Sequence, residues 1–161
     1  MSKRHLVLCL LTGMTFLASA SASERAALSE PADIPPELLK NITFLHGHPD
    51  LRWRVEGNQQ LHRGDFARAA EHFTRAARYA DKPSQAAIAE LLWDGKGVPR
   101  NRPLAYAWMD LAAERGYRSF LMKREAMWQA LDDAEREQAI EVGTQLYADY
   151  GDDVAKPRSR N

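Results

Sequence analysis

A helical pattern with small residues on one face, between residues 86 and 116, constrains this chain more than any other part of its sequence. After a loop with two glycines, the residues that fall three or four apart are Ala105, Trp108, Ala112, Ala113 and Gly116. This spacing places them on one face of a helix, where small side chains allow close packing and the aromatic ring fills the remaining space. Ala107 lies off this face, so Ala107→Leu is expected to damage the fold less than Ala105→Leu or Ala112→Leu. Such a helix cannot bury its apolar face alone, so the sequence predicts a neighbouring unit of the same shape.

The preceding segment supplies that neighbour. When Asp65 is aligned with Asn101, 36 positions later, the second helices of the two units correspond residue by residue. The aligned pairs are Ala69 with Ala105, Phe73 with Met109, Ala76 and Ala77 with Ala112 and Ala113, and Ala80 with Gly116. The first helices align at a shorter offset of 31, which pairs Leu61 with Leu92. The difference indicates an insertion in the loop between Gly95 and Asn101, where length variation disturbs little packing.

Two motifs identify the kind of repeat. The string Gly95-Lys96-Gly97-Val98, followed by Ala105, Trp108, Ala112-Ala113 and Gly116, resembles a Sel1-like repeat, a relative of the tetratricopeptide repeat with a longer glycine-containing loop. The preceding unit is similar to a tetratricopeptide repeat at Trp53, Gly57, Gly64-Asp65-Phe66, Ala69, Phe73 and Ala76. The resemblance covers about residues 51–120, with departures at Ala89, Leu92, Asn101, Leu104 and Phe120, the last of which stands where Ala is common. It implies an all-α fold, a short right-handed α-solenoid of helix pairs.

The first 22 residues have the features of a secretory signal peptide. Lys3 and Arg4 precede a mostly apolar run over residues 6–17, and small residues at 18–22 supply cleavage patterns. The run is short for a membrane span, so the mature chain is expected to be periplasmic or secreted, without a stable membrane anchor. Cys9, the one cysteine, leaves with the signal, so no internal disulfide is expected. The remaining 20 basic and 22 acidic side chains argue against a nucleic-acid partner.

Three further segments follow the signal. Residues 23–49 contain four prolines and little periodicity, which predicts a linker or an arm lying on the first repeat. Residues 50–150 are predicted to be the Sel1/TPR-like helical repeat domain, with Asp50 and Ser84 capping its first and third helices. Its last two helices, the second of them capped by Asp132-x-x-Glu135, are expected to form a C-terminal helical cap on the stack. Residues 151–161 are predicted to be a disordered charged tail.

Three polar clusters resemble catalytic or ligand-binding motifs, and each has a simpler explanation. His46-Gly47-His48 with Asp50 offers metal ligands, but no spacing fixes a third ligand, which favours a surface loop. Asp132 and Asp133 are adjacent on a helix and do not face each other as paired acids do, so capping explains them better. Gly95-Lys96-Gly97 lacks the full phosphate-loop pattern. We therefore expect no catalytic residue, no metal site and no cofactor.

A polar face on the first helix favours binding instead. Arg54, Asn58 and His62 recur every four residues and share this face. In the family that the sequence resembles, the first helices of successive units line the concave face, and the positions equivalent to these three are Gln85, Ala89 and Trp93. In some related repeats a basic residue and an Asn at these places hold a partner's carboxylate, and here one unit has both.

The predicted binding residues are thus Arg54, Asn58 and Trp93. Arg54 can make a bidentate contact to a carboxylate, and Trp93 can supply an aromatic anchor. The alternative is that Arg54 and Asn58 are solvated and that Trp93 packs in the core.

These observations predict a protein that binds a protein or peptide partner, as an adaptor or scaffold in the cell envelope. Two other functions remain open. Some secreted Sel1-like proteins have been linked to hydrolysis of cell-wall or β-lactam-type substrates, but those are rich in disulfide-forming cysteines, unlike this mature chain. The third option is a structural subunit of an envelope complex. A pocket that joined His46, His48 and an acid would favour catalysis over binding.

Overall fold

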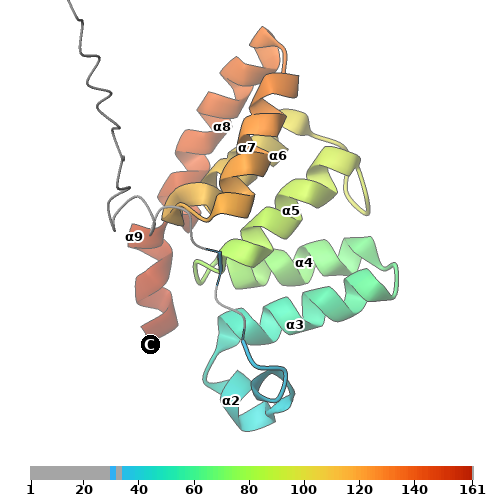
Figure 1. The fold of residues 1–161 in the computed structure, drawn as a ribbon, viewed down its shortest axis with the longest axis vertical. Coiled ribbons are helices and arrows are strands. Elements are labelled where there is room, and N and C mark those ends of the chain that lie inside the picture. The colour runs from blue at the N-terminus through green and yellow to red at the C-terminus, as the bar shows by residue number, and fades with distance from the viewer. Residues whose placement is uncertain (1–29, 32–33, 161) are drawn as a thin grey trace, which may run out of the picture.

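The computed structural model describes residues 30–31 and 34–160, and every regular element in these ranges is helical (Figure 1). The elements are η1 (Leu38–Lys40), α2 (Ile42–His46), α3 (Pro49–His62), α4 (Phe66–Ala77), α5 (Lys82–Asp94), α6 (Arg102–Ala112), η2 (Ala113–Arg115), α7 (Arg118–Ala130), α8 (Asp133–Tyr150), α9 (Asp152–Ala155) and η3 (Lys156–Arg160). The expected signal peptide at residues 1–22 lies outside the described residues. Among the described helices, none combines the length and the apolar character that crossing a membrane requires.

The helices pack as successive pairs. α3 lies against α4, α4 against α5, and α5 against α6, while α6 also contacts α7 and α8. Figure 1 shows the α3–α4 pair on one side of α5, with α6, α7 and α8 on the other. The prediction of an all-α stack of helix pairs that ends in further C-terminal helices is confirmed.

The alignment of the two repeats is visible in both burial and backbone conformation. The residues that the 36-residue offset pairs in the middle of the second helices are at most 3% exposed. They are Ala69 and Ala105, Phe73 and Met109, Ala76 and Ala112, and Ala77 and Ala113. Each unit then ends in a left-handed residue, Ala80 with a φ of 61° and Gly116 with a φ of 72°. The offset therefore pairs structurally equivalent positions.

Burial does not distinguish Ala107 from Ala105 and Ala112, contrary to the basis of the expectation for position 107. Ala107 lies off the small-residue face of α6, yet it is only 1% exposed. The reason is that α8 packs on α6 from another side, and a Cβ added at Gly143 of α8 would lie 3.9 Å from the Cβ of Ala107. α6 is thus enclosed by α5 and α8, and a larger side chain at position 107 would press on α8.

Two helices begin earlier than their expected caps. α5 starts after Asp81, whose carboxylate accepts a hydrogen bond from the N–H of Ser84 at 3.0 Å, so the cap is Asp81 and not Ser84. α3 starts at Pro49, which places Asp50 inside the first turn. Both helices have a proline in the first turn, where the missing N–H leaves no intrahelical bond unmade.

The inserted loop of the second repeat packs against the first repeat. At Gly97, φ is 71°, and an added Cβ would lie 2.4 Å from the backbone nitrogen of Ala67 at the start of α4. Gly64, in the shorter loop of the first repeat, has a similar φ of 78° but no atom within 4 Å of an added Cβ. Gly97 therefore satisfies a close backbone approach as well as a left-handed conformation, and this contact holds the loop on α4.

A buried lysine connects the repeats to the end of the chain. Lys82, in the first turn of α5, is 0% exposed. Its Nζ donates to the side-chain oxygen of Gln85 at 3.1 Å and to the carbonyl oxygen of Leu111 at 3.1 Å. It also forms ion pairs with Glu114 at 2.6 Å and with Asp152 at 3.1 Å. A buried charge is tolerated only when it is paired and hydrogen-bonded, and Lys82 obtains its partners from α5, α6, η2 and α9.

Asp152 completes this network from the C-terminal side. Arg115 binds both carboxylate oxygens of Asp152, at 2.8 and 2.9 Å, and Lys156 lies 2.6 Å from one of them. The N–H of Asp152 donates to Glu114 at 3.1 Å. Burial opposes ionisation of Asp152, but the hydrogen bonds from Arg115 and Lys156 and the charge of Lys82 outweigh it and hold the pKa of Asp152 well below its usual value.

The C-terminal segment therefore differs from the disordered tail expected over residues 151–161. Residues 151–155 pack on the repeats, with Asp152 8% exposed and Ala155 0% exposed. The segment continues as α9 and η3. The expectation rested on charge and position at the chain end, whereas the partners that order this segment lie far away in the sequence.

Replacing Lys82 with Met should lower the free energy of unfolding by about 3–5 kcal/mol, because Glu114 and Asp152 would lose the buried cation they share. Lys123 provides a matched control, since its ion pair with Glu90 is about half exposed. Lys123→Met should change stability by less than about 1 kcal/mol. Urea unfolding followed by circular dichroism at pH 7 measures both. Equal losses in the two variants would contradict the importance assigned to Lys82.

The stability of the protein should fall on acidification partly through Asp152. The folded-state pKa of Asp152 lies below the unfolded value of about 3.9. The ionised carboxylate therefore contributes fully to the free energy of unfolding above about pH 5, and this contribution is lost as the pH falls below the unfolded pKa toward the folded-state pKa. Asp152→Asn should therefore be much less stable than the parent at pH 7, with a difference that narrows between about pH 4 and pH 2. Urea melts across this range test it, and a constant difference would show that the carboxylate is not responsible.

Candidate functional site

A groove lies between the N-terminal arm, described at residues 30–31 and 34–41, and residues of three helices. It has a volume of about 430 Å³. We call it the arm groove, and its lining residues are Glu30, Pro31, Ile34, Leu39, Arg54, Asn58, Pro83 and Phe120. The first four belong to the arm, and the others come from α3, α5 and α7. In Figure 1 the arm passes the start of α5 and the start of α3 before it reaches α2.

Glu30 binds the beginning of α7. Its carboxylate accepts a hydrogen bond from the N–H of Ser119 at 3.0 Å and another from the Ser119 hydroxyl. The N-cap residue of α7, Tyr117, makes no side-chain capping bond. The first turn of a helix presents unpaired N–H groups and a partial positive charge. A carboxylate from the arm therefore does for α7 what a local capping residue does for other helices.

Arg54 and Asn58 lie on the opposite wall of the groove. Arg54 forms an ion pair of 3.2 Å with Asp81, the cap of α5. Burial raises the pKa of Asp81, in opposition to the charge of Arg54 and the hydrogen bond from Ser84. Asn58 is exposed. Arg54 is thus already engaged with a carboxylate of the same chain. Of the two predicted binding residues on α3, only Asn58 is exposed to solvent.

The aromatic part of the wall comes from Phe120. It is 8% exposed and packs edge-on against Tyr117, with ring centroids 5.8 Å apart. Pro83, in the first turn of α5, lines the same groove. Together they give the groove an apolar floor beside the polar groups of Ser119 and Asn58. This combination can hold an extended segment that alternates a carboxylate with apolar residues.

Trp93 does not join Arg54 and Asn58. It lies in the last turn of α5, whereas the groove is built on the first turn. Its ring is half-buried against the core, and the guanidinium of Arg102 lies 4.8 Å from the ring centroid. The backbone carbonyl of Trp93 accepts a hydrogen bond from Arg100 at 3.1 Å. The prediction that Trp93 completes one site with Arg54 and Asn58 is therefore corrected, and its packing matches the alternative, a tryptophan held by the core.

The other equivalent positions explain this separation. Gln85 and Ala89 are the counterparts of Arg54 and Asn58 in the second repeat, and both are 0% exposed. The amide nitrogen of Gln85 donates to the carbonyl oxygen of Tyr150 at 3.2 Å, at the end of α8. The C-terminal helices thus cover the part of the face that the second repeat would otherwise present. The open part belongs to the first repeat.

The sequence analysis did not assign to the site the lining residues Glu30 and Phe120, or Ser119, which binds Glu30. Glu30 lies in the proline-rich segment, which was assigned only as a linker or arm. Phe120 carried a signal, because it replaces the Ala that is common at this position in the resembling family. Ser119 carried none, since its role depends on contact with a residue 89 positions earlier.

The histidines of the chain make local contacts. His46 is exposed, and His48 packs edge-on against Phe44, with ring centroids 4.2 Å apart. His72, which aligns with Trp108, stacks on Trp53 at 5.6 Å. Within the described ranges, no group of three or more His, Cys, Asp or Glu side chains is arranged to hold a metal ion.

The neighbouring acids Asp132 and Asp133 act as the capping interpretation predicted. Asp132 accepts from the N–H of Glu135 at 2.8 Å, and the Glu135 carboxylate accepts from the N–H of Asp132 at 3.0 Å. Asp133 forms an ion pair with Arg136 at 2.9 Å.

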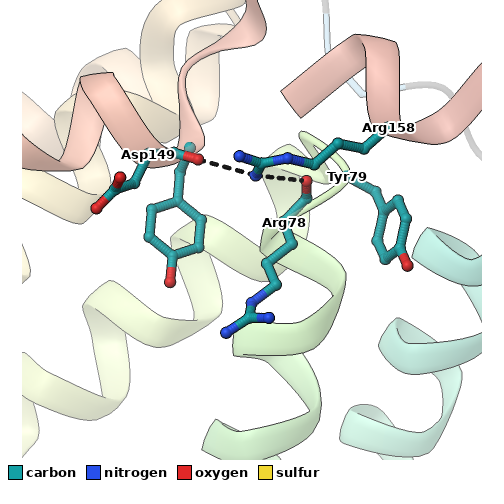
Figure 2. Close-up of a pocket in the computed structure, with 5 residues that line it drawn as sticks. Arg78, Tyr79, Asp149 and Arg158 are labelled. Atoms are coloured by element: carbon teal, nitrogen blue, oxygen red, sulfur yellow. Dashed lines mark hydrogen bonds between the residues drawn. The ribbon is translucent and has the colours of Figure 1, made fainter. Parts of the chain in front are cut away.

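A second cavity, of about 690 Å³, lies where the C-terminal segment meets the first repeat. Its lining residues are Arg78, Tyr79, Asp149, Tyr150 and Arg158. Figure 2 shows the guanidinium of Arg158 between two backbone carbonyls, donating to Asp149 at 2.9 Å and to Arg78 at 3.3 Å. These bonds connect the end of α8 to the end of α4. We therefore interpret this cavity as part of the packing between α4, α8 and η3, and not as a binding site.

Comparison with known proteins gives one match. The sequence model of the Sel1 repeat matches residues 57–78 and 82–117. The two matched ranges cover the second half of α3 with α4, and α5 with α6 and η2. Searches of curated proteins and of solved structures gave no significant match.

Trp93 should behave as a packing residue in a melting experiment. Trp93→Ala should lower the free energy of unfolding by about 2–4 kcal/mol, because a half-buried ring and its contact with Arg102 are lost. Asn58→Ala, at an exposed position, should change it by less than about 0.5 kcal/mol. Thermal melts followed by circular dichroism compare the two. A Trp93→Ala variant as stable as the parent would contradict the packing role of Trp93.

Proposed function

This chain belongs to the Sel1-like repeat proteins, and we propose that it is an exported binding protein that holds an extended segment of a partner protein in the arm groove. Sel1 repeats generally mediate protein–protein interaction. Both repeats of this chain are complete helix pairs, and their packing provides the rigid walls that a binding groove needs.

The observation that carries the proposal is the arm that lines the groove. Residues 30–31 and 34–35 have no helical structure and run beside Arg54, Asn58, Pro83 and Phe120. A groove that accommodates a chain segment of this kind has a suitable width and chemistry for a similar segment from another protein. Such segments gain specificity from pockets for alternate side chains and from a few polar contacts at fixed positions.

The chemistry of the groove suits binding better than catalysis. Ser119 and the first turn of α7 supply hydrogen-bond donors, and Phe120 and Pro83 supply apolar surface. Arg54 is engaged with Asp81. These groups can hold and orient a ligand. They agree with the binding function that is typical of the family, and the hydrolase alternative gains no support from the contacts of His46 and His48.

Export is the part of the proposal that rests on residues 1–22. Their positive start, apolar run and small-residue cleavage patterns support secretion to the periplasm or beyond, where the protein would serve as an adaptor or scaffold. N-terminal sequencing of protein recovered from the envelope fraction tests this. A chain that keeps Met1 in the cytosolic fraction would contradict it.

A bulky side chain at Asn58 should block the groove without disturbing the fold. Asn58 is exposed on α3 and lines the groove, so Asn58→Trp adds an indole where a partner segment would lie. Gln59→Trp is the matched control, because Gln59 is an exposed neighbour on the same helix that is not part of the groove lining. The immobilised mature chain is incubated with envelope extract, and bound proteins are quantified by mass spectrometry.

We expect Asn58→Trp to reduce capture of specific partners by about tenfold or more, and Gln59→Trp to retain it, because steric blocking removes a contact at the centre of the site. Circular dichroism spectra and melting temperatures should be alike for both variants. Equal capture by Asn58→Trp and Gln59→Trp would show that partners bind elsewhere.

A further inference from the structure

The arm occupies its groove through one polar anchor and a small apolar contact. Glu30 supplies the two hydrogen bonds to Ser119, and Pro31, Ile34 and Leu39 line the groove. Glu30 is exposed, and both of its hydrogen bonds are accessible to water. The prolines at 31, 35 and 36 have no backbone N–H, which limits the pairing of this segment with other backbone groups. An attachment of this kind is local and can be released without unfolding a helix.

The groove nevertheless depends on a ligand at this position. α7 has no capping side chain of its own at Tyr117, so its first N–H groups are satisfied by Glu30 or by whatever replaces it. The groove also retains open volume of about 430 Å³ with the arm in place. These two features describe a site that is built for a carboxylate-bearing chain segment and is not completely filled by the arm.

We propose that the arm is a tethered competitor for the partner, and that the partner segment repeats its chemistry. The sequence of the arm is Glu30-Pro31, followed by two residues and then Ile34. The partner would thus present an acidic residue, a proline directly after it, and an aliphatic side chain three positions beyond the proline. This inference rests on the proposed function, and it adds the kind of partner and the way in which access to the groove is limited.

Charge selects a single carboxylate at this site. The polar donors at the α7 end are the N–H and the hydroxyl of Ser119, and together they donate to the two oxygens of one carboxylate group. The charge of Arg54, on the other wall, is balanced by Asp81. A segment with one acid next to a proline matches this arrangement, whereas a run of acids would place further negative charge beside Asp81 without a cation for it.

The apolar part of the segment is selected by Phe120 and Pro83. Phe120 is 8% exposed and lines the groove, so it offers a partner segment a small apolar contact. Pro31 and Ile34 share the groove with this ring. A partner proline and aliphatic residue would cover it in the same way, and a polar segment would leave it exposed to water.

Linkage to the same chain gives the arm its advantage as a competitor. A segment joined to α2 and α3 by a few residues stays at an effective concentration of about a millimolar near the groove. A free segment that makes the same contacts displaces the arm only when its own concentration exceeds this effective concentration. Weakening Glu30 should therefore increase the apparent affinity of the groove for an added segment, even though no residue of the groove walls has changed.

The test uses the full mature chain and a fluorescent peptide with the sequence of residues 29–40. Fluorescence anisotropy gives the dissociation constant for the parent, for Glu30→Ala and for Glu37→Ala. Glu37 is the matched control, since it is an exposed acid on the same arm that does not line the groove. A second peptide has Gln in place of the residue equivalent to Glu30.

We expect Glu30→Ala to bind the first peptide about tenfold or more tightly than the parent, the factor that corresponds to one charged hydrogen bond lost by the competitor. Glu37→Ala should match the parent. The peptide with Gln should bind Glu30→Ala at least about tenfold more weakly than the peptide with Glu. Ser119→Ala combined with Glu30→Ala should weaken the preference for Glu over Gln, because the hydroxyl donor is lost while the backbone N–H of residue 119 remains.

Three outcomes would overturn the inference. Equal affinity of the parent and Glu30→Ala would show that the arm does not compete. Equal binding of the Glu and Gln peptides would show that the groove does not select a carboxylate. If no variant binds either peptide while Asn58→Trp still abolishes capture from envelope extract, the inference about the partner fails and the proposed function stands. If Asn58→Trp also leaves capture unchanged, the proposed function fails as well.

Discussion

The positive charge of Lys82 is the constraint on which the rest of this structure depends. The lysine is fully buried at the start of α5, where an unpaired charge could not be tolerated. Its partners come from α6, η2 and the segment after α8, so these elements must assemble around one point. Apolar packing of small residues brings the helices together, and the charge of Lys82 determines where the end of the chain must lie.

That placement also determines where the protein can bind. Gln85 is bonded to the end of α8, and both Gln85 and Ala89 are 0% exposed, so these two positions of the second repeat are closed to a partner. The groove that remains is bounded by the first repeat and by the start of α7, and the arm lies in it. The arm groove, the proposed binding position, thus lies on the first repeat, whereas a long stack of repeats presents a continuous surface.

The sequence predicted the features that depend on local periodicity and on turn chemistry. The small-residue face of α6, its counterpart in α4, the left-handed end of each unit and the cap at Asp132 all follow from residues close together in the chain.

The features that the sequence did not predict correctly are contacts between distant residues. Ala107 is buried because α8 covers a second face of α6, and a helical pattern indicates which face is apolar without indicating how many neighbours the helix has. Trp93 was assigned to the groove by its spacing, but burial of an aromatic ring depends on the elements around it. Glu30 with Ser119, and Lys82 with Asp152, join segments whose proximity no spacing rule encodes.

The position of Asp152 near the end of the chain has a consequence for how the protein matures. A polypeptide leaves the ribosome with its N-terminus first, so both repeats are present before the carboxylate that completes the environment of Lys82. Until the last segment emerges, α5 contains a cation that cannot be buried without a large free-energy cost, and the second repeat stays loosely packed. A chain in this state can still be unfolded and threaded through a narrow passage. Emergence of the segment that contains Asp152 then completes the environment of Lys82, and truncation before Asp152 should leave the chain more sensitive to proteolysis.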